Sequence, residues 1–356
     1  MTEYIKTLEN HKLSFSSLNL LDYSPVFYRE HILNPKEEDT TFFRKGAAVD
    51  CMLTEPDKFK NRYAVSTLEV PGGMMGEFIK TYIHFIIQKD LSKEYQKRKR
   101  YEDVVRKAAY DNSGFKIKYE SVIKKFEAPE IQEYVNFTLD NIDKTILSVE
   151  EHTQTINMVN MLTSSEYTSK YFTTAGPLQD ITNQLEFEME YTTDLGKDYI
   201  IRGIIDKVII DHHNKTIQAV DLKTTGKPVY SFETSYVKYA YYRQAAIYTK
   251  FLEQKMLTQY PGYEIKPFLF IVIETACNNP PLIFKISSED LKVGWNGGVS
   301  VYTNKKVKGV TELIKEVEWH QDTNNWEIKK EIEENSGIIN LNQFKSNGDA
   351  NNNKKN

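Results

Sequence analysis

The clearest pattern along the chain is a strict alternation of apolar and acidic residues that begins at about Gln184. The stretch QLEFEMEY places its apolar side chains on one face and its glutamates on the other, which predicts a half-buried strand. A turn over residues 194–197, an apolar strand over 199–210, a second turn around residues 212–214 and a strand over 217–223 follow. This order predicts a three-stranded antiparallel meander.

The segments on either side of the meander have helical patterns. Residues 14–33 predict a serine-capped helix that restarts at a Ser-Pro pair, and residues 46–53 (GAAVDCML) predict a short helix of small residues. Helix-favouring sequence rich in Lys and Glu fills residues 76–150. A helix over residues 232–252 then precedes the strand PFLFIVIET. The fold class is therefore α/β (α+β), with the order β-β-β-α-β after a helical N-terminal portion.

A chain of 356 residues with 40% hydrophobic residues can bury a substantial core, which excludes disorder throughout. We expect one domain over residues 1–344, with a helical portion at 13–180, a sheet core at 181–290 and C-terminal elements at 291–344. The polar, low-complexity segment 345–356 is predicted to be disordered.

Composition excludes several kinds of site and location. The apolar stretch over residues 268–273 is far shorter than the roughly 20 residues that cross a bilayer. The N-terminus also lacks a basic start followed by an apolar run, so we expect a cytoplasmic protein without a membrane partner. Cys51 and Cys277 are the only cysteines, so any metal must be held mainly by oxygen or imidazole.

Charge gives one local signal for nucleic acid. The net charge of −4 provides no global attraction to DNA. However, Lys97, Arg98, Lys99 and Arg100 crowd one stretch of the helical portion. A solvated helix face explains this run, and so does a surface that contacts DNA phosphates.

The meander brings carboxylates together. If its second turn is symmetric about residues 213–214, Asp206 falls directly opposite Asp221, with the two side chains about 5 Å apart on one face. Lys223 points to the same face, because it lies two residues beyond Asp221. A first turn centred on the glycine of DLGK likewise sets Glu186 opposite Asp206. Three carboxylates and one lysine are thus expected on one surface of the sheet.

Like charges this close repel one another unless a cation lies among them, and hard oxygen ligands suit Mg²⁺ or Mn²⁺. A lysine beside such a metal can orient or deprotonate water, or it can stabilise charge that builds on a phosphate oxygen. A lone D-x-K tripeptide usually marks only a surface salt bridge. Asp206 and Asp221 instead interrupt apolar strands, where unpaired carboxylates would be costly, so a functional site is favoured. His212 and His213 need no function beyond a polar turn.

Several motifs together resemble the PD-(D/E)XK nuclease superfamily, and more closely the exonuclease VIII-type and lambda-exonuclease-type recombination nucleases of phages and prophages. The resemblance covers about residues 13–290. Its motifs are the G-x-x-D of Gly203 to Asp206, the VDLKTT of residues 220–225, the Q-x-x-x-Y of Gln244 to Tyr248, the SxxxLxxSPxxYR of residues 17–29, the KGAAVDCML helix and the strand that ends IET at residues 273–275.

The resemblance implies a restriction-endonuclease-like core, in which helices flank a central mixed sheet. It implies that Asp206 and Asp221 ligate Mg²⁺ or Mn²⁺ and that Lys223 is the catalytic lysine. A glutamate on the preceding strand assists, best matched by Glu186 with Glu188 as runner-up. Gln244 and Tyr248 share one helix face and can reach the mouth of the site, although ordinary helix packing would also explain them.

One position departs from the family. Its small-residue helix usually reads G-x-x-x-H, with the histidine as a metal ligand, whereas this chain carries Gly46 and Asp50 at these places. Asp50 would supply an oxygen ligand in place of a nitrogen and shift the preference towards harder ions such as Mg²⁺. A bare carboxylate among Ala47, Ala48 and Val49 would otherwise be expensive to bury.

We therefore expect a metal-dependent DNA exonuclease that degrades one strand from the end of a linear duplex. No G-x-x-x-x-G-K-[ST] motif couples the reaction to ATP on this chain. By resemblance, the product strand would pass to a single-strand annealing protein, and the enzyme would assemble into a ring around DNA. Two alternatives stay open, a sequence-specific endonuclease and a nuclease-like DNA-binding protein that the change at Asp50 has inactivated.

Overall fold

The computed structural model describes residues 7–35, 41–88, 95–173 and 176–339. The chain divides into two compact units, the first built from residues 1–42 and 160–356 and the second from residues 43–159. The extent of one domain over residues 1–344 stays a prediction, and the predicted disordered tail lies outside the described residues.

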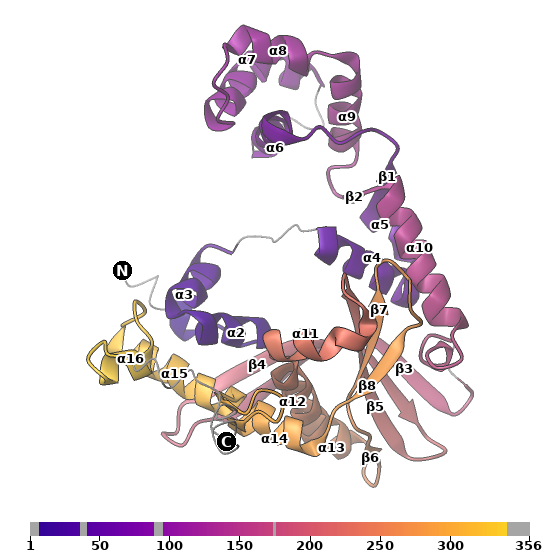
Figure 1. Cartoon of the computed structure of the whole chain (residues 1–356), viewed down its shortest axis with the longest axis vertical. Coiled ribbons are helices and arrows are strands. Elements are labelled where there is room, and N and C mark those ends of the chain that lie inside the picture. Colours follow the sequence, from indigo (N-terminus) through magenta and orange to yellow (C-terminus); the bar gives the residue numbers. More distant parts are fainter. Residues whose placement is uncertain (1–6, 36–40, 89–94, 174–175, 340–356) are drawn as a thin grey trace, which may run out of the picture. The chain divides into compact units, whose positions relative to one another are not determined.

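The first unit is organised around a mixed β-sheet (Figure 1). Its strands lie in the order β3-β4-β5-β7-β8, and β6 (Glu264–Ile265) also pairs with β5. The bounds of the main strands are β3 (Gln179–Thr192), β4 (Asp198–Asp211), β5 (Thr216–Thr225), β7 (Leu269–Glu274) and β8 (Leu282–Lys285). The meander β3-β4-β5 is antiparallel as predicted, and β7 joins it parallel to β5. The predicted α/β class with a central mixed sheet is confirmed.

Helices flank this sheet. The N-terminal pair α2 (Phe15–Tyr23) and α3 (Pro25–Leu33) forms as predicted, with Ser14 capping the first helix and Pro25 opening the second. The helix predicted over residues 232–252 is wrong in one respect. It is divided into α11 (Phe232–Lys238) and α12 (Tyr241–Phe251) by Ala240, whose φ of 52° lies in the left-handed region.

The C-terminal part of the first unit adds shorter elements. A π-helical turn (Leu252–Met256) and α13 (Leu257–Gln259) extend α12. The remaining elements are α14 (Ser288–Asn296), β9 (Gly298–Val299), β10 (Lys306–Val307), α15 (Val310–Thr323) and α16 (Lys330–Glu334).

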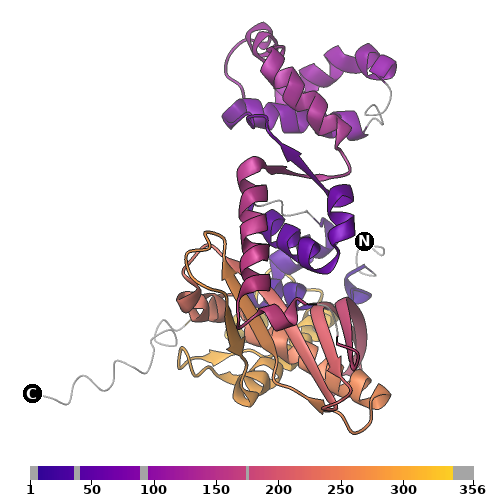
Figure 2. The ribbon, with the colours of Figure 1, turned by 90° about the vertical axis from the view of Figure 1, so that its right-hand side faces the viewer.

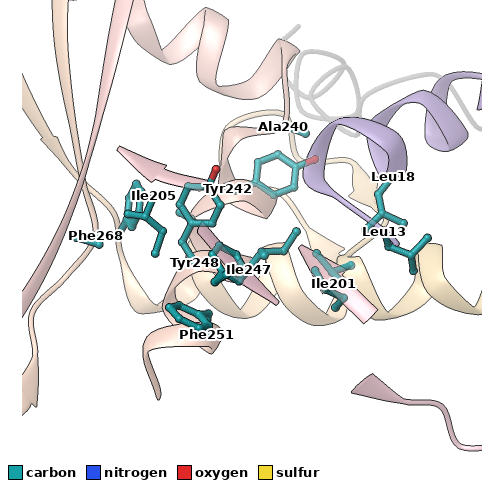
Figure 3. Packing of buried hydrophobic residues seen from close by; sticks show 14 of the residues in the cluster. Leu13, Leu18, Ile201, Ile205, Ala240, Tyr242, Ile247, Tyr248, Phe251 and Phe268 are labelled. Carbon is teal, nitrogen blue, oxygen red and sulfur yellow. The ribbon is translucent and has the colours of Figure 1, made fainter. Parts of the chain in front are cut away.

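The core of the first unit lies between α12 and one face of the sheet. Figure 3 shows Ile247, Tyr248 and Phe251 of α12 among the apolar side chains Ile201 and Ile205 of β4. The ring of Phe251 also stacks on Phe187 of β3, with centroids 4.3 Å apart. Burying aliphatic and aromatic side chains of this size contributes roughly 1.5–3 kcal/mol each, so this packing fixes α12 on the sheet.

The second unit is mainly helical (Figure 2). Its helix α4 (Thr41–Thr54) contains the predicted small-residue helix, and the parallel pair β1 (Tyr63–Ser66) and β2 (Thr145–Ser148) forms a separate small sheet. The other helices are α5 (Phe59–Arg62), α6 (Gly73–Gln88), α7 (Tyr95–Asn112), α8 (Tyr119–Phe126), α9 (Pro129–Asp140) and α10 (Val149–Ser164). Within the described ranges of the chain, no helix is long and apolar enough to cross a membrane.

Candidate active site

Asp221 and Lys223 lie at the centre of the sheet, on the face that α12 covers. They pair with Phe270 and Val272 of the neighbouring parallel strand β7. Asp221 is only 1% exposed, and Lys223 Nζ lies 2.7 Å from its Oδ2. Alternation along β5 therefore presents both side chains to the same face, as predicted from their spacing.

Asp206 lies where the β4-β5 ladder stops. The predicted register of this pair is confirmed, since Ile210 pairs with Ile217 and Lys207 pairs with Val220, one step before Asp206 would face Asp221. Beyond the last backbone pair, a side chain links the two strands: Asp206 Oδ2 accepts a hydrogen bond of 2.9 Å from the Leu222 N–H. This bond fixes one oxygen of Asp206 beside the strand that carries Asp221.

Gln244 and Tyr248 close the site from α12. Gln244 Nε2 donates to Asp221 Oδ1 at 2.8 Å and lies 3.1 Å from Tyr248 Oη. Both side chains are 6% exposed. Their predicted shared helix face is confirmed, and the glutamine does more than fill space because it binds the carboxylate directly. Its other amide atom, Oε1, is buried with no hydrogen-bond partner in the described part of the chain.

Burial and charge act against each other in this site. Burial raises the pKa of Asp221, and the nearby Lys223 ammonium and Gln244 amide oppose that rise. Burial alone would lower the pKa of Lys223, but the charge of Asp221 outweighs it, with Tyr241 and Asp206 contributing, so the pKa of Lys223 is raised. Lys223 is thus held as a cation.

Tyr241 is a member of the site that the sequence did not identify. The Lys223 ammonium lies 4.7 Å from the centroid of its ring, a cation–π distance. Tyr241 precedes Gln244 by three residues on the same helix, which places both on one helix face. That spacing was visible in the sequence, but it was obscured because Tyr239 and Tyr242 flank the position.

The prediction that Glu186 lies opposite Asp206 is wrong. Glu186 pairs with Ile204, two residues away, and its side chain is exposed. Glu188 is exposed as well, and it forms an ion pair of 2.5 Å with Lys12. The role of either glutamate at the metal therefore stays a prediction that rests on the family resemblance alone.

Steric contacts explain why the G-x-x-D motif begins with a glycine. A Cβ on Gly203 would approach the ring of Phe187 to 2.8 Å and the ring of Tyr248 to 3.0 Å. Real Cβ atoms essentially never come as close as the Phe187 contact, and the Tyr248 contact would be tight, so a residue other than glycine would force these rings to shift.

We predict that Gly203→Ala lowers the free energy of unfolding by about 1–3 kcal/mol, because the added methyl overpacks this contact. Tyr248 would have to shift away from Gln244 as well. Gly176→Ala is the matched control, since its Cβ would meet no atom closer than 3.8 Å. Chemical denaturation of the three proteins measures the effect, and equal stability of both variants would contradict the steric explanation.

Two further groups of predicted site residues, Asp50 and the basic run of residues 97–100, lie in the second unit. Asp50 is on α4 beside the buried Val49, and it is half-buried. Its place in the metal site stays a prediction. The basic run is on α7, where Lys99 is exposed. The side chains of Lys97, Arg98 and Arg100 lie outside those that the structure describes.

The donor set suits a hard divalent cation. Across the described residues, no group of three or more His, Cys, Asp or Glu side chains gathers closely enough to hold a metal ion. The two carboxylates and the unpartnered amide oxygen of Gln244 nevertheless supply oxygen ligands side by side. Mg²⁺ commonly binds through one or two carboxylates and keeps several waters, so Asp206 and Asp221, with Gln244 Oε1 beside them, fit such an ion.

A mixed sheet flanked by helices, with two aspartates and a lysine on adjacent central strands, is consistent with the restriction-endonuclease-like class. Residues 162–326 match the family model of the PD-(D/E)XK nuclease superfamily. This segment is therefore similar to the PD-(D/E)XK nucleases, a superfamily that typically uses divalent metal ions. Its assignment to the exonuclease VIII-type or lambda-exonuclease-type subfamily stays a prediction.

Comparison with solved structures gives a similar chain, the crystal structure of a "Putative exonuclease" from Eubacterium rectale. The two sequences are 13% identical, and the similarity covers 94% of this chain and 85% of that chain with a TM-score of 0.41. No curated protein matches the sequence.

Proposed function

We propose that the protein is a metal-dependent DNA exonuclease that hydrolyses phosphodiester bonds from the ends of linear duplex DNA. The observation that carries the proposal is the set of Asp206, Asp221, Lys223 and Gln244 within the segment that matches the PD-(D/E)XK nuclease model. Action on DNA and cleavage from an end come from the resemblance of the sequence to phage recombination nucleases.

In this proposal Asp206 and Asp221 bind Mg²⁺ or Mn²⁺. The metal would activate water and polarise the phosphate of the scissile bond. Gln244 holds Asp221 in one orientation through its 2.8 Å hydrogen bond, and Tyr248 holds Gln244 in turn. The charge of Asp221 raises the pKa of Lys223, so Lys223 is a cation that can stabilise negative charge on the phosphate.

One incubation series tests the proposal. Linear duplex and covalently closed circular duplex are each incubated with the purified protein in Mg²⁺, in Mn²⁺ or in EDTA. We expect nucleotide release from the linear duplex with either metal, none in EDTA, and an intact circle. Cleavage of the circle would establish an endonuclease instead. An absence of cleavage on every substrate would favour the nuclease-like DNA-binding protein.

We further propose that the basic run of α7 contacts DNA phosphates. Such contacts carry no sequence information, but they make affinity depend on salt. Neutralising Lys97, Arg98, Lys99 and Arg100 together should flatten the slope of log affinity against log salt by roughly 0.9 for each phosphate of duplex DNA that the variant no longer neutralises. Fluorescence anisotropy with labelled duplex at several salt concentrations measures the slope.

A matched variant neutralises Lys250 and Lys266, which form ion pairs with glutamates on the first unit. Its salt slope should equal that of the wild type. An unchanged slope in the α7 variant would restore the interpretation of this run as a solvated helix face.

The remaining partners are carried over from the resemblance. We propose that the product strand is handed to a single-strand annealing protein and that the enzyme assembles as a ring around DNA. Light scattering of the purified protein, with and without a linear duplex, tests the assembly. A monomer under both conditions would remove the ring from the proposal.

A further inference from the structure

Gln184 has an unusual backbone at a central position of β3. Its φ is 49°, in the left-handed region that L residues other than glycine rarely adopt, and asparagine and aspartate are the commonest exceptions. The pairs on either side are Asn183 with Lys207 and Leu185 with Ile205. Gln184 therefore faces Asp206 across the β3-β4 ladder.

The pleat of β4 changes phase at the same point. Ile201 and Ile205 of β4 are buried in the core under α12, and so are Val208 and Ile210. Regular alternation would bury residues separated by two or four positions, whereas Ile205 and Val208 are three apart. The alternation is thus interrupted at Asp206 and Lys207.

This interruption decides where the carboxylate of Asp206 goes. If the pleat of Ile201 and Ile205 continued unbroken, Asp206 would share the face of Ile204, which is 45% exposed. It instead turns towards β5, where its Oδ2 accepts from the Leu222 N–H. The register of Val208 with Ala219 then continues on the core face that also carries Asp221.

We infer that the left-handed backbone at Gln184 is a positioning device for Asp206. The β3-β4 pairs keep one register on both sides of Gln184, so the device acts on the pleat and directs the Asp206 carboxylate to β5 and beside Asp221. The geometric part of this inference concerns the metal-free chain, and only its consequence for cleavage rests on the proposed function. A strained backbone persists only where the surrounding fold stabilises it, and such residues cluster at functional sites.

The inference assigns the effect to the backbone of Gln184. A β-branched residue disfavours φ near +50°, whereas glycine adopts it freely and alanine adopts it with moderate strain. Gln184→Val should therefore return the strand towards a regular pleat and move Asp206 away from Leu222. Gln184→Gly and Gln184→Ala should both retain the native arrangement.

The Leu222 amide reports the position of Asp206 without any metal. In isotope-labelled, metal-free protein we expect both Gln184→Val and Asp206→Ala to shift this amide resonance and to speed its hydrogen exchange. The glycine and alanine variants should keep the wild-type values. Lys215→Val is the control for strain alone, because Lys215 has a φ of 52° in the exposed β4-β5 turn, and it should leave the Leu222 amide unchanged.

Cleavage then gives a separate readout. Misplacing a group that orients a metal ligand typically reduces activity by about 10–100-fold, which is expected for Gln184→Val and not for Lys215→Val. A native Leu222 amide in Gln184→Val would overturn the inference. If that variant does not fold, loss of the native Leu222 signal in both Gln184→Gly and Gln184→Ala would overturn it. An inactive wild type with the expected amide pattern would contradict the proposed function and leave the inference standing.

Discussion

Replacing Lys223 with alanine is expected both to remove cleavage and to weaken the fold. The ammonium lies 2.7 Å from the carboxylate of Asp221, which is 1% exposed. Its loss removes the cation that would stabilise phosphate charge, and comparable losses in other enzymes reduce turnover by about 10²–10³-fold. It also leaves a buried carboxylate without its counter-ion, which destabilises by up to about 3–5 kcal/mol.

A double-mutant cycle separates the two effects. Asp221→Asn alone should abolish cleavage and also lower the free energy of unfolding, because it leaves the Lys223 ammonium, whose side chain is only 20% exposed, without its counter-ion. The combination of Lys223→Ala with Asp221→Asn should recover most of the stability that Lys223→Ala loses, and no cleavage.

The control is Lys250→Ala, which breaks a partly exposed ion pair with Glu253 and should cost less than about 1 kcal/mol. Urea denaturation and a cleavage assay on the same samples measure both quantities. A double variant as unstable as Lys223→Ala would show that the buried pair is not the source of the loss.

Truncating Phe270 to alanine should give the largest loss of stability in the sheet. Phe270 is fully buried on β7, paired with Asp221, and its ring meets those of Phe268 and Tyr241 at 5.0 and 5.6 Å. Removing a buried phenyl ring typically costs about 3–5 kcal/mol, since the cavity that remains collapses only in part. Tyr241 would also lose the neighbour that holds it against Lys223.

Phe270→Leu is the matched variant, because it keeps most of the apolar contact and should lose much less stability. Thermal and urea unfolding of both proteins measure the difference. Equal losses in the two variants would mean that the site beside Asp221 tolerates a cavity, contrary to the packing described above.

The second turn of the meander shows why part of the site could be predicted from sequence. Alternation along two long apolar strands leaves one register that buries both, because a slip by one residue would expose every core side chain. The turn at residues 213–214 agrees with that register, which sets Asp206 one step beyond the last pair, Lys207 with Val220, and so level with Asp221. The family motifs point to the same residues.

The first turn shows where that reasoning fails. A turn centred on the glycine of DLGK is the simplest expectation, but Thr192 pairs with Asp198, so the turn is centred on Leu195. Gly196 comes one residue later, where a φ of 80° is required. A glycine in a longer hairpin loop often occupies this left-handed position, and this shift sets Glu186 two residues away from Asp206.

The residues around the break between α11 and α12 do not predict it. The sequence around Tyr239 and Ala240 contains neither glycine nor proline, and it continues the helical pattern. The break depends on tertiary contacts, including the hydrogen bond of 3.0 Å from Asn19 Nδ2 to the Tyr239 carbonyl. Contacts between residues this far apart in sequence are invisible to a pattern of neighbouring residues.

The most direct test of the central claim compares the wild type with Asp206→Asn and Asp221→Asn on one end-labelled linear duplex. Each protein is first shown to be folded and is then assayed with Mg²⁺, with Mn²⁺ and with EDTA. Because both carboxylates are proposed metal ligands, we predict that the wild type releases nucleotides only with metal and that both variants lose this release. Release by either variant at the wild-type rate, or by the wild type in EDTA, would contradict a metal-dependent nuclease site at Asp206 and Asp221.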